Sequence, residues 1–375
     1  MESKTAIFSA NRGYALTSSR TLLIQHFLSS DWNVVLATSD DAESLSLCEM
    51  GARLEPVVFN RGGFSPLTDI QAYQRLLVVY KKWRPALVQN FHAKPVILGP
   101  LAARPVLGDQ VRVVNTITGL GHAFIAGGIT SRLAGMGYRL ARGRTDATVF
   151  QNKDDLGLFL EKRWVKESGA KLIPGSGVDV DRFQMVDRRG RDMRSPVVVM
   201  LGRLLRQKGI PEFIEVARRI KKDWPQSRFV LAGEEDPMHP DAVTAEWVQE
   251  QSFVEYLGRL SDVQPLLARA DLLLFPSYYR EGLPRVILEA AATGLPTVAF
   301  DVPGVREAVR DGETGYLVEY RDIDALTEKV WELLGDAEKR LGLGRAAREM
   351  VEKKFDIRAI KERYLDLYRE LGVDV

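Results

Sequence analysis

Two glutamates in one short segment have the types and the spacing that suit a sugar phosphate. Glu281 and Glu289 lie eight residues apart, soon after the apolar run Leu272–Phe275. Pro284 suits the first turn of a helix, so we expect the chain to turn at Gly282 and then enter a helix. N–H groups at a helix N-terminus attract anions, and carboxylates accept hydrogen bonds from hydroxyl groups. The segment therefore predicts a site for a ligand that carries both phosphate and hydroxyl groups.

A second polar cluster follows the apolar run Val197–Leu201. The sequence GRLLRQKG begins at Gly202 and contains Arg203 and Lys208. Arginine supplies a planar fork of donors and lysine a mobile point charge, so the two together can neutralise a diphosphate. Gly233 follows another predicted strand and would let a ligand approach the backbone closely.

The elements that must position these residues alternate between short β-branched runs and longer stretches of helical period, which is typical of parallel sheets. The predicted strands cover residues 5–10, 33–38, 53–59, 87–92, 111–118, 147–151, 171–174, 197–201, 229–232, 254–257, 272–275, 297–300 and 315–318. The predicted helices cover residues 18–30, 67–83, 95–104, 130–144, 211–224, 284–293, 323–334 and 357–371.

The fold class is therefore α/β, with two doubly wound parallel-sheet domains. The polar, basic stretch 186–195 lacks an apolar period and is interpreted as a linker. We expect an N-terminal domain over 1–185, a C-terminal domain over 186–355 and a final helix over 356–375. Ligands of such sheets bind outside the carboxyl ends of the strands. The expected site is a cleft that both domains face.

The composition is that of an ordinary globular protein. The chain has 375 residues, of which 45% are hydrophobic, and a formal net charge of +2. Its single cysteine, Cys48, excludes an internal disulfide framework and a multi-cysteine zinc site. The sequence shows neither the apolar core of a signal peptide nor a run long enough to span a bilayer, so we expect a cytoplasmic protein. Residues 53–144 hold 13 basic and three acidic residues, which suggests an anionic partner for the first half.

Several motifs in the second half together resemble one family. Residues 281–290 match a Glu-x7-Glu pattern that runs E-G-x-P-x4-E-A, residues 202–209 match a Gly-Arg-Leu…Lys-Gly pattern, and the turns at 301–307 and 311–318 follow in the same order. This half resembles the family 4 retaining glycosyltransferases, whose fold, GT-B, has two Rossmann-like domains.

The resemblance implies a role for each residue of these motifs. Arg203 and Lys208, beside Gly202 and Gly233, would hold the diphosphate of a sugar donor, and Glu289 would bind the ribose hydroxyls. Glu281, with the backbone of Gly282 and Leu283 and the helix start at Pro284, would hold the transferred sugar and the phosphates. The final helix would cross back to the first domain.

The first half is less typical of the family. Where many members carry a Gly-Gly loop after the first strand, this chain has Arg12 and Gly13, which we take as substitutes at the donor phosphate. Residues 90–95 and 116–124 look like the subgroup that extends lipid-diphosphate-linked sugars in bacterial polysaccharide and glycan assembly. The resemblance then implies that His92 lies beside the reacting sugar. It also suggests an acceptor site, made of Lys94, Thr118, Gly119 and His122.

These inferences predict a retaining transferase that moves a sugar, with a lean towards N-acetylhexosamine, from a UDP-sugar to a polyprenyl-diphosphate-linked sugar. An isomerase such as a UDP-N-acetylglucosamine 2-epimerase is the alternative, and a non-catalytic nucleotide-sugar-binding protein is a third possibility. The Asp179–Asp181 and Asp322–Asp324 pairs spell D-x-D, but neither ends a strand of the nucleotide-binding half, and Asp322 is expected to cap a helix. We expect no metal, no other cofactor and no nucleic acid partner.

The expected location is peripheral, on the inner face of the plasma membrane. Arginines cluster in the helix predicted near 131–144, and clustered basic residues are attracted to anionic lipid surfaces. An arginine-rich helix on the surface of a soluble domain is the alternative interpretation.

Overall fold

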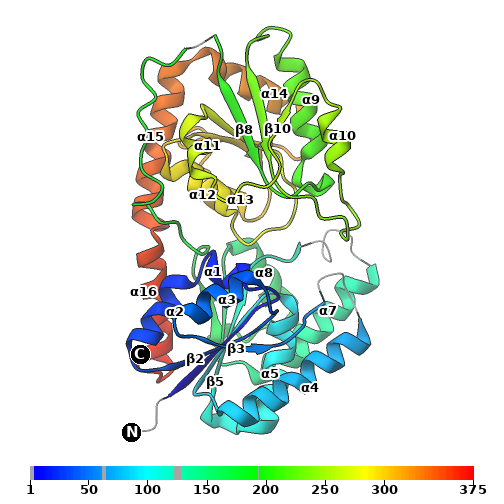
Figure 1. Ribbon diagram of the computed structural model, residues 1–375, viewed down its shortest axis with the longest axis vertical. Helices are drawn as coiled ribbons and strands as arrows, with labels where there is room; N and C mark the ends of the chain where they lie inside the picture. The colour runs from blue at the N-terminus through cyan, green and yellow to red at the C-terminus, as the bar shows by residue number, and fades with distance from the viewer. Residues whose placement is uncertain (1–3, 61–64, 122–127, 193) are drawn as a thin grey trace. The chain divides into compact units, whose positions relative to one another are not determined.

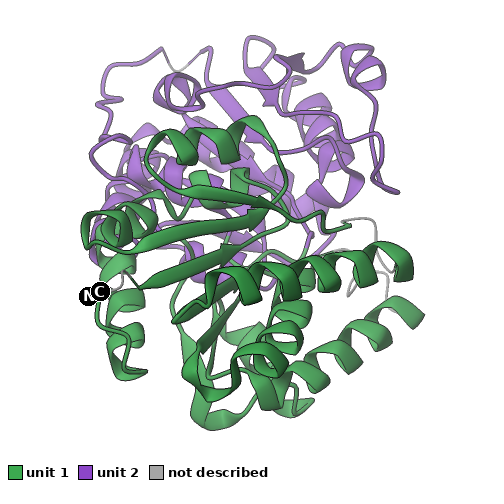
Figure 2. Cartoon of the chain, turned by 60° about the horizontal axis from the view of Figure 1, so that its bottom comes forward, with its two compact units in different colours: residues 1–176, 280–283, 357–375 green, residues 177–279, 284–356 purple. Residues whose placement is uncertain are grey.

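The protein is described by a computed structural model over residues 4–60, 65–121, 128–192 and 194–375. It forms two compact units, coloured separately in Figure 2. Unit 1 contains residues 1–176, 280–283 and 357–375, and unit 2 contains residues 177–279 and 284–356. The chain therefore enters unit 1 three times.

Unit 1 is built on a seven-stranded sheet in which every neighbouring pair is parallel, in the order β3-β2-β1-β4-β5-β6-β7. The strands are β1 (Thr5–Ser9), β2 (Asn33–Thr38), β3 (Arg53–Pro56), β4 (Leu87–Phe91), β5 (Arg112–Ile117), β6 (Ala147–Phe150) and β7 (Ala170–Leu172). The helices are α1 (Tyr14–Thr17), α2 (Thr21–Ser29), α3 (Ala42–Glu49), α4 (Pro66–Trp83), α5 (Ala93–Leu107), α7 (Gly128–Ala141), α8 (Lys153–Glu161) and α16 (Ile357–Glu370).

Alternate residues of β1 reach opposite faces of this sheet, as the pleat of a strand requires. Phe8 joins a core with α2 and with the final helix α16, where Phe27 lies 5.8 Å from the ring of Tyr368. Ile7 joins the core on the other face, together with residues of α4 and α5. Both faces are thus covered, which is why the middle of β1, Ala6–Phe8, is apolar on both faces.

Unit 2 has a six-stranded parallel sheet in the order β10-β9-β8-β11-β12-β13. Its strands are β8 (Val197–Leu201), β9 (Arg228–Ala232), β10 (Glu255–Tyr256), β11 (Leu272–Phe275), β12 (Thr297–Phe300) and β13 (Gly315–Val318). Its helices are α9 (Ile210–Ile220), α10 (Ala245–Gln249), α11 (Gln264–Arg269), α12 (Arg285–Ala292), α13 (Val305–Ala308), α14 (Ile323–Gly335) and α15 (Ala337–Lys354) (Figure 1). Helices α9 and α14 pack together on one face, and α12 contacts α11 and α15.

The strand order reverses direction once in each sheet. The reversal falls between β1 and β4 in unit 1 and between β8 and β11 in unit 2. Ligands of open α/β sheets bind at such switch points, beyond the carboxyl ends of the strands. The loops that follow these four strands are therefore the first places to look for a site.

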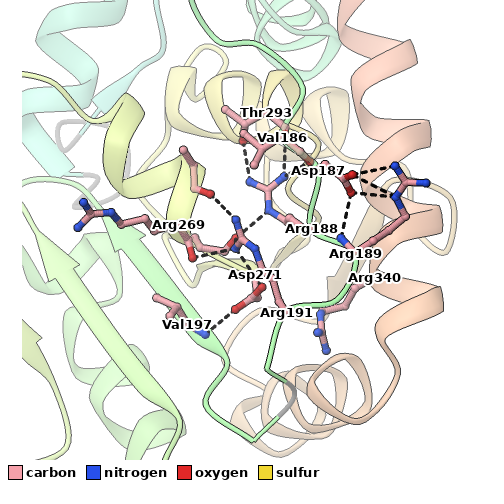
Figure 3. Close-up of polar contacts among 12 residues, drawn as sticks. Val186, Asp187, Arg188, Arg189, Arg191, Val197, Arg269, Asp271, Thr293 and Arg340 are labelled. Carbon is pink, nitrogen blue, oxygen red and sulfur yellow. Dashed lines mark hydrogen bonds and ion pairs between the residues drawn. The ribbon is translucent and has the colours of Figure 1, made fainter.

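Arginines hold the stretch that the sequence predicts to be a linker within unit 2 (Figure 3). Arg188 is buried, and it donates to the carbonyl oxygens of Leu267, Ala270 and Thr293, at the ends of α11 and α12. Arg191 donates to the carbonyls of Ala268 and Ala270 and to Asp271. These arginines satisfy carbonyls that a helix C-terminus leaves without partners.

The prediction of two doubly wound parallel sheets is confirmed, and every predicted strand is present. The sequence pattern did not predict three longer helices, α3, α8 and α15, or the short helices α1, α10, α11 and α13. Across the described residues, no helix has both the length and the apolar character that crossing a bilayer requires.

Candidate active site

In unit 2 the two predicted phosphate-binding side chains meet at one aromatic ring. The Arg203 guanidinium carbon lies 5.9 Å, and Lys208 Nζ 5.0 Å, from the ring centre of Tyr279. Arg203 Nη1 also donates to Asp236 Oδ2 at 2.6 Å. Both cations follow β8, while Tyr279 follows β11, so they lie at the switch point of the sheet. Two cations gathered there suit an anionic ligand.

Glycines make this edge of unit 2 compact enough to bring the loops together. A β-carbon at Gly209 would lie 2.1 Å from the carbonyl oxygen of Pro276, and the residue has a φ of +84°. A β-carbon at Gly233 would lie 1.7 Å from the carbonyl oxygen of Gly202. The close approach that requires glycine at position 233 is thus made by the chain itself, at Gly202.

Glu289 lies in the second turn of α12 with its side chain 12% exposed. Arg285 Nη2 donates to Glu289 Oε1 at 2.9 Å. Burial raises the pKa of the Glu289 carboxyl above its ordinary value, although Arg285 and Arg182 oppose the rise. Pro284 is the N-cap of this helix, so the chain enters a helix at the predicted place. A buried acceptor on a helix can receive hydroxyl groups of a ligand.

In unit 1, His92 lies at the carboxyl end of β4, beside the loop that follows β1. The backbone N–H of Asn11 donates to His92 Nδ1 at 3.4 Å. His92 has a φ of +68°, a conformation that residues other than glycine rarely adopt. Such strained residues gather at functional sites, so the geometry agrees with a functional role for His92.

The loop after β1 uses its glycine for packing. The Gly13 N–H donates to Asp41 Oδ2 at 3.0 Å, and a β-carbon at Gly13 would lie 2.2 Å from Asp41 Oδ1. Burial raises the pKa of Asp41, but hydrogen bonds from Ser39, Ser44 and Gly13 outweigh it, so the pKa is lowered. Arg12, next to Gly13, is exposed.

Among the predicted acceptor residues, Lys94 forms an ion pair with Asp69 of α4. Thr118 and Gly119 follow β5, and Gly119 has a φ of +105°. His122, predicted as a further acceptor residue, falls outside the residues that the structure describes.

The Glu281 loop, residues 280–283, is part of unit 1. Within it, Glu281 pairs with Gly119 in the loop that follows β5. The Gly282 N–H donates to the carbonyl oxygen of Thr118 at 3.0 Å, so this predicted phosphate donor already has a partner. Leu283 is buried and packs over Gly175. The predicted residues thus fall into two groups, one in each unit: Gly202, Arg203, Lys208, Gly233, Pro284 and Glu289 belong to unit 2, and the other described ones belong to unit 1.

Other residues of these groups were missed by the sequence analysis. Tyr279 and Arg280 directly precede Glu281, and Asp236 follows β9. Asn152 caps α8, and its side chain reaches the Glu281 loop. The signals available for them were an aromatic and a cation beside a known motif, and an N-cap pattern after β6.

In the part of the chain that the structure describes, no group of three or more His, Cys, Asp or Glu side chains could hold a metal ion. Asp322 accepts the N–H of Ala325 at 2.8 Å and caps α14, as the sequence predicts. Asp179 accepts the N–H groups of Asp181 and Arg182. Both D-x-D pairs thus use a carboxylate to order their own turn.

Comparison with known proteins agrees with this architecture. Residues 195–336 match the family model described as "Glycosyl transferases group 1", and residues 7–146 match "Glycosyl transferase 4-like". A sucrose-phosphate synthase from Thermosynechococcus elongatus has a TM-score of 0.79 at 21% identity, covering 98% of this chain and 99% of that one. Anabaena HepE in complex with UDP has a TM-score of 0.79 at 18% identity, covering 98% and 100%. These structural likenesses show the fold.

Two sequence relatives match most of the chain. One is the N,N'-diacetylbacillosaminyl-diphospho-undecaprenol alpha-1,3-N-acetylgalactosaminyltransferase of Campylobacter jejuni, 27% identical over 377 residues, 96% of this chain and 97% of the relative. The other is the UDP-Gal:alpha-D-GlcNAc-diphosphoundecaprenol alpha-1,3-galactosyltransferase of Escherichia coli, 25% identical over 326 residues, 83% and 82% of the two chains.

The two parallel sheets, with candidate sites at their switch points, define a protein of the GT-B class. Within that class the chain belongs to the group 1, family 4-like glycosyltransferases, and it is a sugar transferase.

Proposed function

We propose that the protein transfers a sugar, by preference an N-acetylhexosamine, from a UDP-sugar to a polyprenyl-diphosphate-linked sugar. The transfer retains the anomeric configuration. The observation that carries the proposal is similarity along most of the chain to two transferases named for diphospho-undecaprenol acceptors. One of these names also specifies a UDP-sugar donor.

The donor half of the proposal rests on Arg203, Lys208 and Glu289 in unit 2. The two cations would stabilise the diphosphate as negative charge develops on it, which is the usual large electrostatic contribution to catalysis. Glu289 would accept hydrogen bonds from the ribose hydroxyls. Fixed positive charge would do the work that other transferases give to a metal ion, so we expect turnover to persist in the presence of a chelator.

The transfer step we propose takes place on one face of the sugar. The bond between the anomeric carbon and the diphosphate oxygen breaks, and the acceptor hydroxyl oxygen bonds to the same face of that carbon. The proton of the hydroxyl goes to the departing phosphate oxygen. Glu281 would orient the sugar, and His92 would lie beside the reacting hydroxyl. Arg12 and Lys94 would meet phosphates of the donor and the acceptor, respectively.

The acceptor is a lipid, so we propose that the protein binds the membrane surface peripherally, on its cytoplasmic side. Helix α7 exposes Ile129 at 75%, Met136 at 61% and Leu140 at 58%, with the exposed Arg132 and Arg139 between them. Apolar side chains interleaved with arginines are typical of a helix that lies in the interface of an anionic bilayer.

The test is UDP release from a panel of UDP-sugars, each with and without a detergent-solubilised polyprenyl-diphosphate sugar. We expect one donor to give release that depends on the acceptor, and analysis of the product to show retention. Silence across the panel, with UDP binding intact, would contradict the UDP-sugar and acceptor assignment.

The same assay separates the transferase from the epimerase. An epimerase would convert the sugar without any acceptor, whereas a transferase would release UDP only slowly by hydrolysis. The relatives from Campylobacter jejuni and Escherichia coli are both named as transferases, and the comparisons do not favour the epimerase.

A further inference from the structure

The Glu281 loop is tied to unit 1 at three successive residues. The Gly121 N–H donates to the carbonyl oxygen of Arg280 at 2.9 Å, and the Gly282 N–H donates to the carbonyl of Thr118 at 3.0 Å. Glu281 itself is paired antiparallel with Gly119. The peptide groups on both sides of Glu281 therefore have fixed partners.

Two glycines allow this close approach. A β-carbon at Gly119 would lie 2.4 Å from the backbone nitrogen of Gly282, and one at Gly282 would lie 2.7 Å from the carbonyl carbon of Thr118. Neither distance is tolerable for real atoms, so both positions must lack a side chain.

Side chains from α8 complete the attachment. Asn152, fully buried, accepts the Asp155 N–H at 2.7 Å and donates through Nδ2 to Asp155 Oδ2 at 3.0 Å and to the Gly282 carbonyl at 2.7 Å. Arg280 donates through Nε to Asp155 Oδ1 at 3.1 Å, and its Nη2 lies 3.0 Å from the same oxygen. One amide and one carboxylate thus hold both the backbone and the arginine of the loop.

Burying the ion pair between Asp155 and Arg280 costs desolvation free energy. The Asp155 side chain is 1% exposed and the Arg280 side chain 24% exposed. Burial raises the pKa of Asp155, although the hydrogen bond from Asn152 and the charge of Arg280 oppose the rise. A buried ion pair adds little net stability compared with apolar packing. What this pair and its hydrogen bonds do supply is direction, because they fix one geometry of the loop.

We propose that Asn152, Asp155 and Arg280 are positioning residues that orient Glu281 towards the transferred sugar. The proposal rests on the proposed function, in which Glu281 binds that sugar. Small misplacements of a substrate-orienting group are costly, since even a shift of about 1 Å can lower a rate by about a hundredfold. Positioning by unit 1 leaves the UDP-binding residues of unit 2 untouched.

The test compares kcat with UDP affinity in Arg280→Ala, Arg280→Lys and Asp155→Asn. We expect Arg280→Ala and Asp155→Asn to lower kcat about 10- to 100-fold while the Kd for UDP stays within about twofold. Arg280→Lys keeps the charge and should recover part of the loss. Retention of kcat within about twofold in Arg280→Ala, whatever happens to the melting temperature, would overturn the proposal.

A matched control exists in the same unit. Arg104 Nη2 lies 2.6 Å from Asp146 Oδ2, with side chains 16% and 20% exposed, and Arg104 also donates to the carbonyl oxygens of Gly108, Val111 and Arg144. Arg104→Lys should therefore leave kcat unchanged. In a Glu281→Gln background, measured at high enzyme concentration, Arg280→Ala should lower kcat less than about threefold further. Full additivity would mean that Arg280 acts independently of Glu281, against the proposal.

Failure of this inference differs from failure of the proposed function. If the wild-type protein shows no acceptor-dependent UDP release, the function is wrong and the variants have no bearing on it. If the wild-type protein is active and the variants match it, the function stands and the positioning role falls.

Discussion

The ring of Tyr279 lies beside both cations that we propose bind the donor phosphates, Arg203 and Lys208. Arg203 and Lys208 both approach its ring, and Asp236 holds the guanidinium from another direction. A flexible lysine and a long arginine would otherwise sample many rotamers, at an entropic cost when a ligand arrives. Pre-ordering these side chains lowers that cost.

Replacing either Arg203 or Lys208 by Ala should lower kcat/KM about 100- to 1,000-fold, the loss typical of removing one donor to a developing negative charge. Steady-state assays of UDP release measure this loss in kcat/KM. Arg206→Ala is the control, because Arg206 is the exposed cation between them. If either variant keeps activity within about twofold of wild type, that residue does not hold the leaving diphosphate.

Glu289 predicts a pH dependence of donor binding. Its pKa in the free protein is raised by burial, and the ionised carboxylate is the better acceptor for ribose hydroxyls. UDP affinity should therefore be highest above the raised pKa and fall as the pH drops through it. Glu289→Gln should weaken UDP binding about tenfold at neutral pH and flatten the profile. Calorimetric titration at several pH values tests both, and an unchanged slope in the variant would contradict the assignment.

At the scale of elements, the arginines of residues 186–192 join the ends of helices that are distant in sequence. Arg188 donates to carbonyls at the ends of α11 and α12. Arg340, in α15, likewise donates to the carbonyls of Leu333 and Leu334 at the end of α14. Burial lowers the pKa of Arg188 to about 10, with repulsion from Arg191 adding to the effect. Carbonyls at helix C-termini carry partial negative charge, which offsets part of the free-energy cost of burying the Arg188 guanidinium.

Arg188→Ala should therefore destabilise unit 2 by about 3 kcal/mol, since it leaves several buried carbonyls without donors. Arg189→Ala is a matched control, because the Arg189 side chain is 78% exposed and pairs with Asp187. It should leave the urea midpoint close to that of the wild type, because an exposed ion pair adds little to stability. Urea unfolding followed by fluorescence compares the two variants, and equal midpoints would show that the hydrogen bonds from Arg188 to the helix ends do not stabilise unit 2.

The strands were predictable because their apolar runs are short and bounded by turn residues, as in β8 and β11. Helix α15 was not predicted, since its sequence AEKRLGLGRAAREMVEKK is largely charged and includes two glycines. Arg203 and Lys208 could be singled out as candidate phosphate ligands from a motif after a strand, and that role stays a prediction. The Asn152–Asp155–Arg280 network was not predictable, because it joins residues more than 120 positions apart and no local pattern encodes such a contact.

On the scale of the whole molecule, charge is unevenly distributed, since residues 53–144 of unit 1 hold 13 basic and three acidic residues. Besides α7, helix α4 exposes Leu67 at 77% and Ile70 at 54%, and both helices pack against α5. Exposed apolar side chains together with arginines match an anionic lipid surface.

We expect the protein to co-sediment with vesicles of anionic phospholipid and less with neutral ones. Reversing Arg132 and Arg139 to Glu should weaken binding at least thirtyfold, at about 1 kcal/mol per basic residue lost. Arg345→Glu with Lys354→Glu, on exposed positions of α15, is the matched control. Equal binding of both double variants would place the lipid contact elsewhere.

The four residues Arg280–Leu283 belong to unit 1, although the chain on both sides of them belongs to unit 2. Helix α16 likewise belongs to unit 1. Recombination between relatives that transfers all of unit 1 would therefore have to bring three separate segments from the same parent. These are residues 1–176, the short loop and the last helix. A single crossover near the middle of the gene would pair a transplanted sheet with a foreign loop and a foreign helix. Productive hybrids should thus be those in which the loop and the partners Thr118, Gly121 and Asn152 come from one parent.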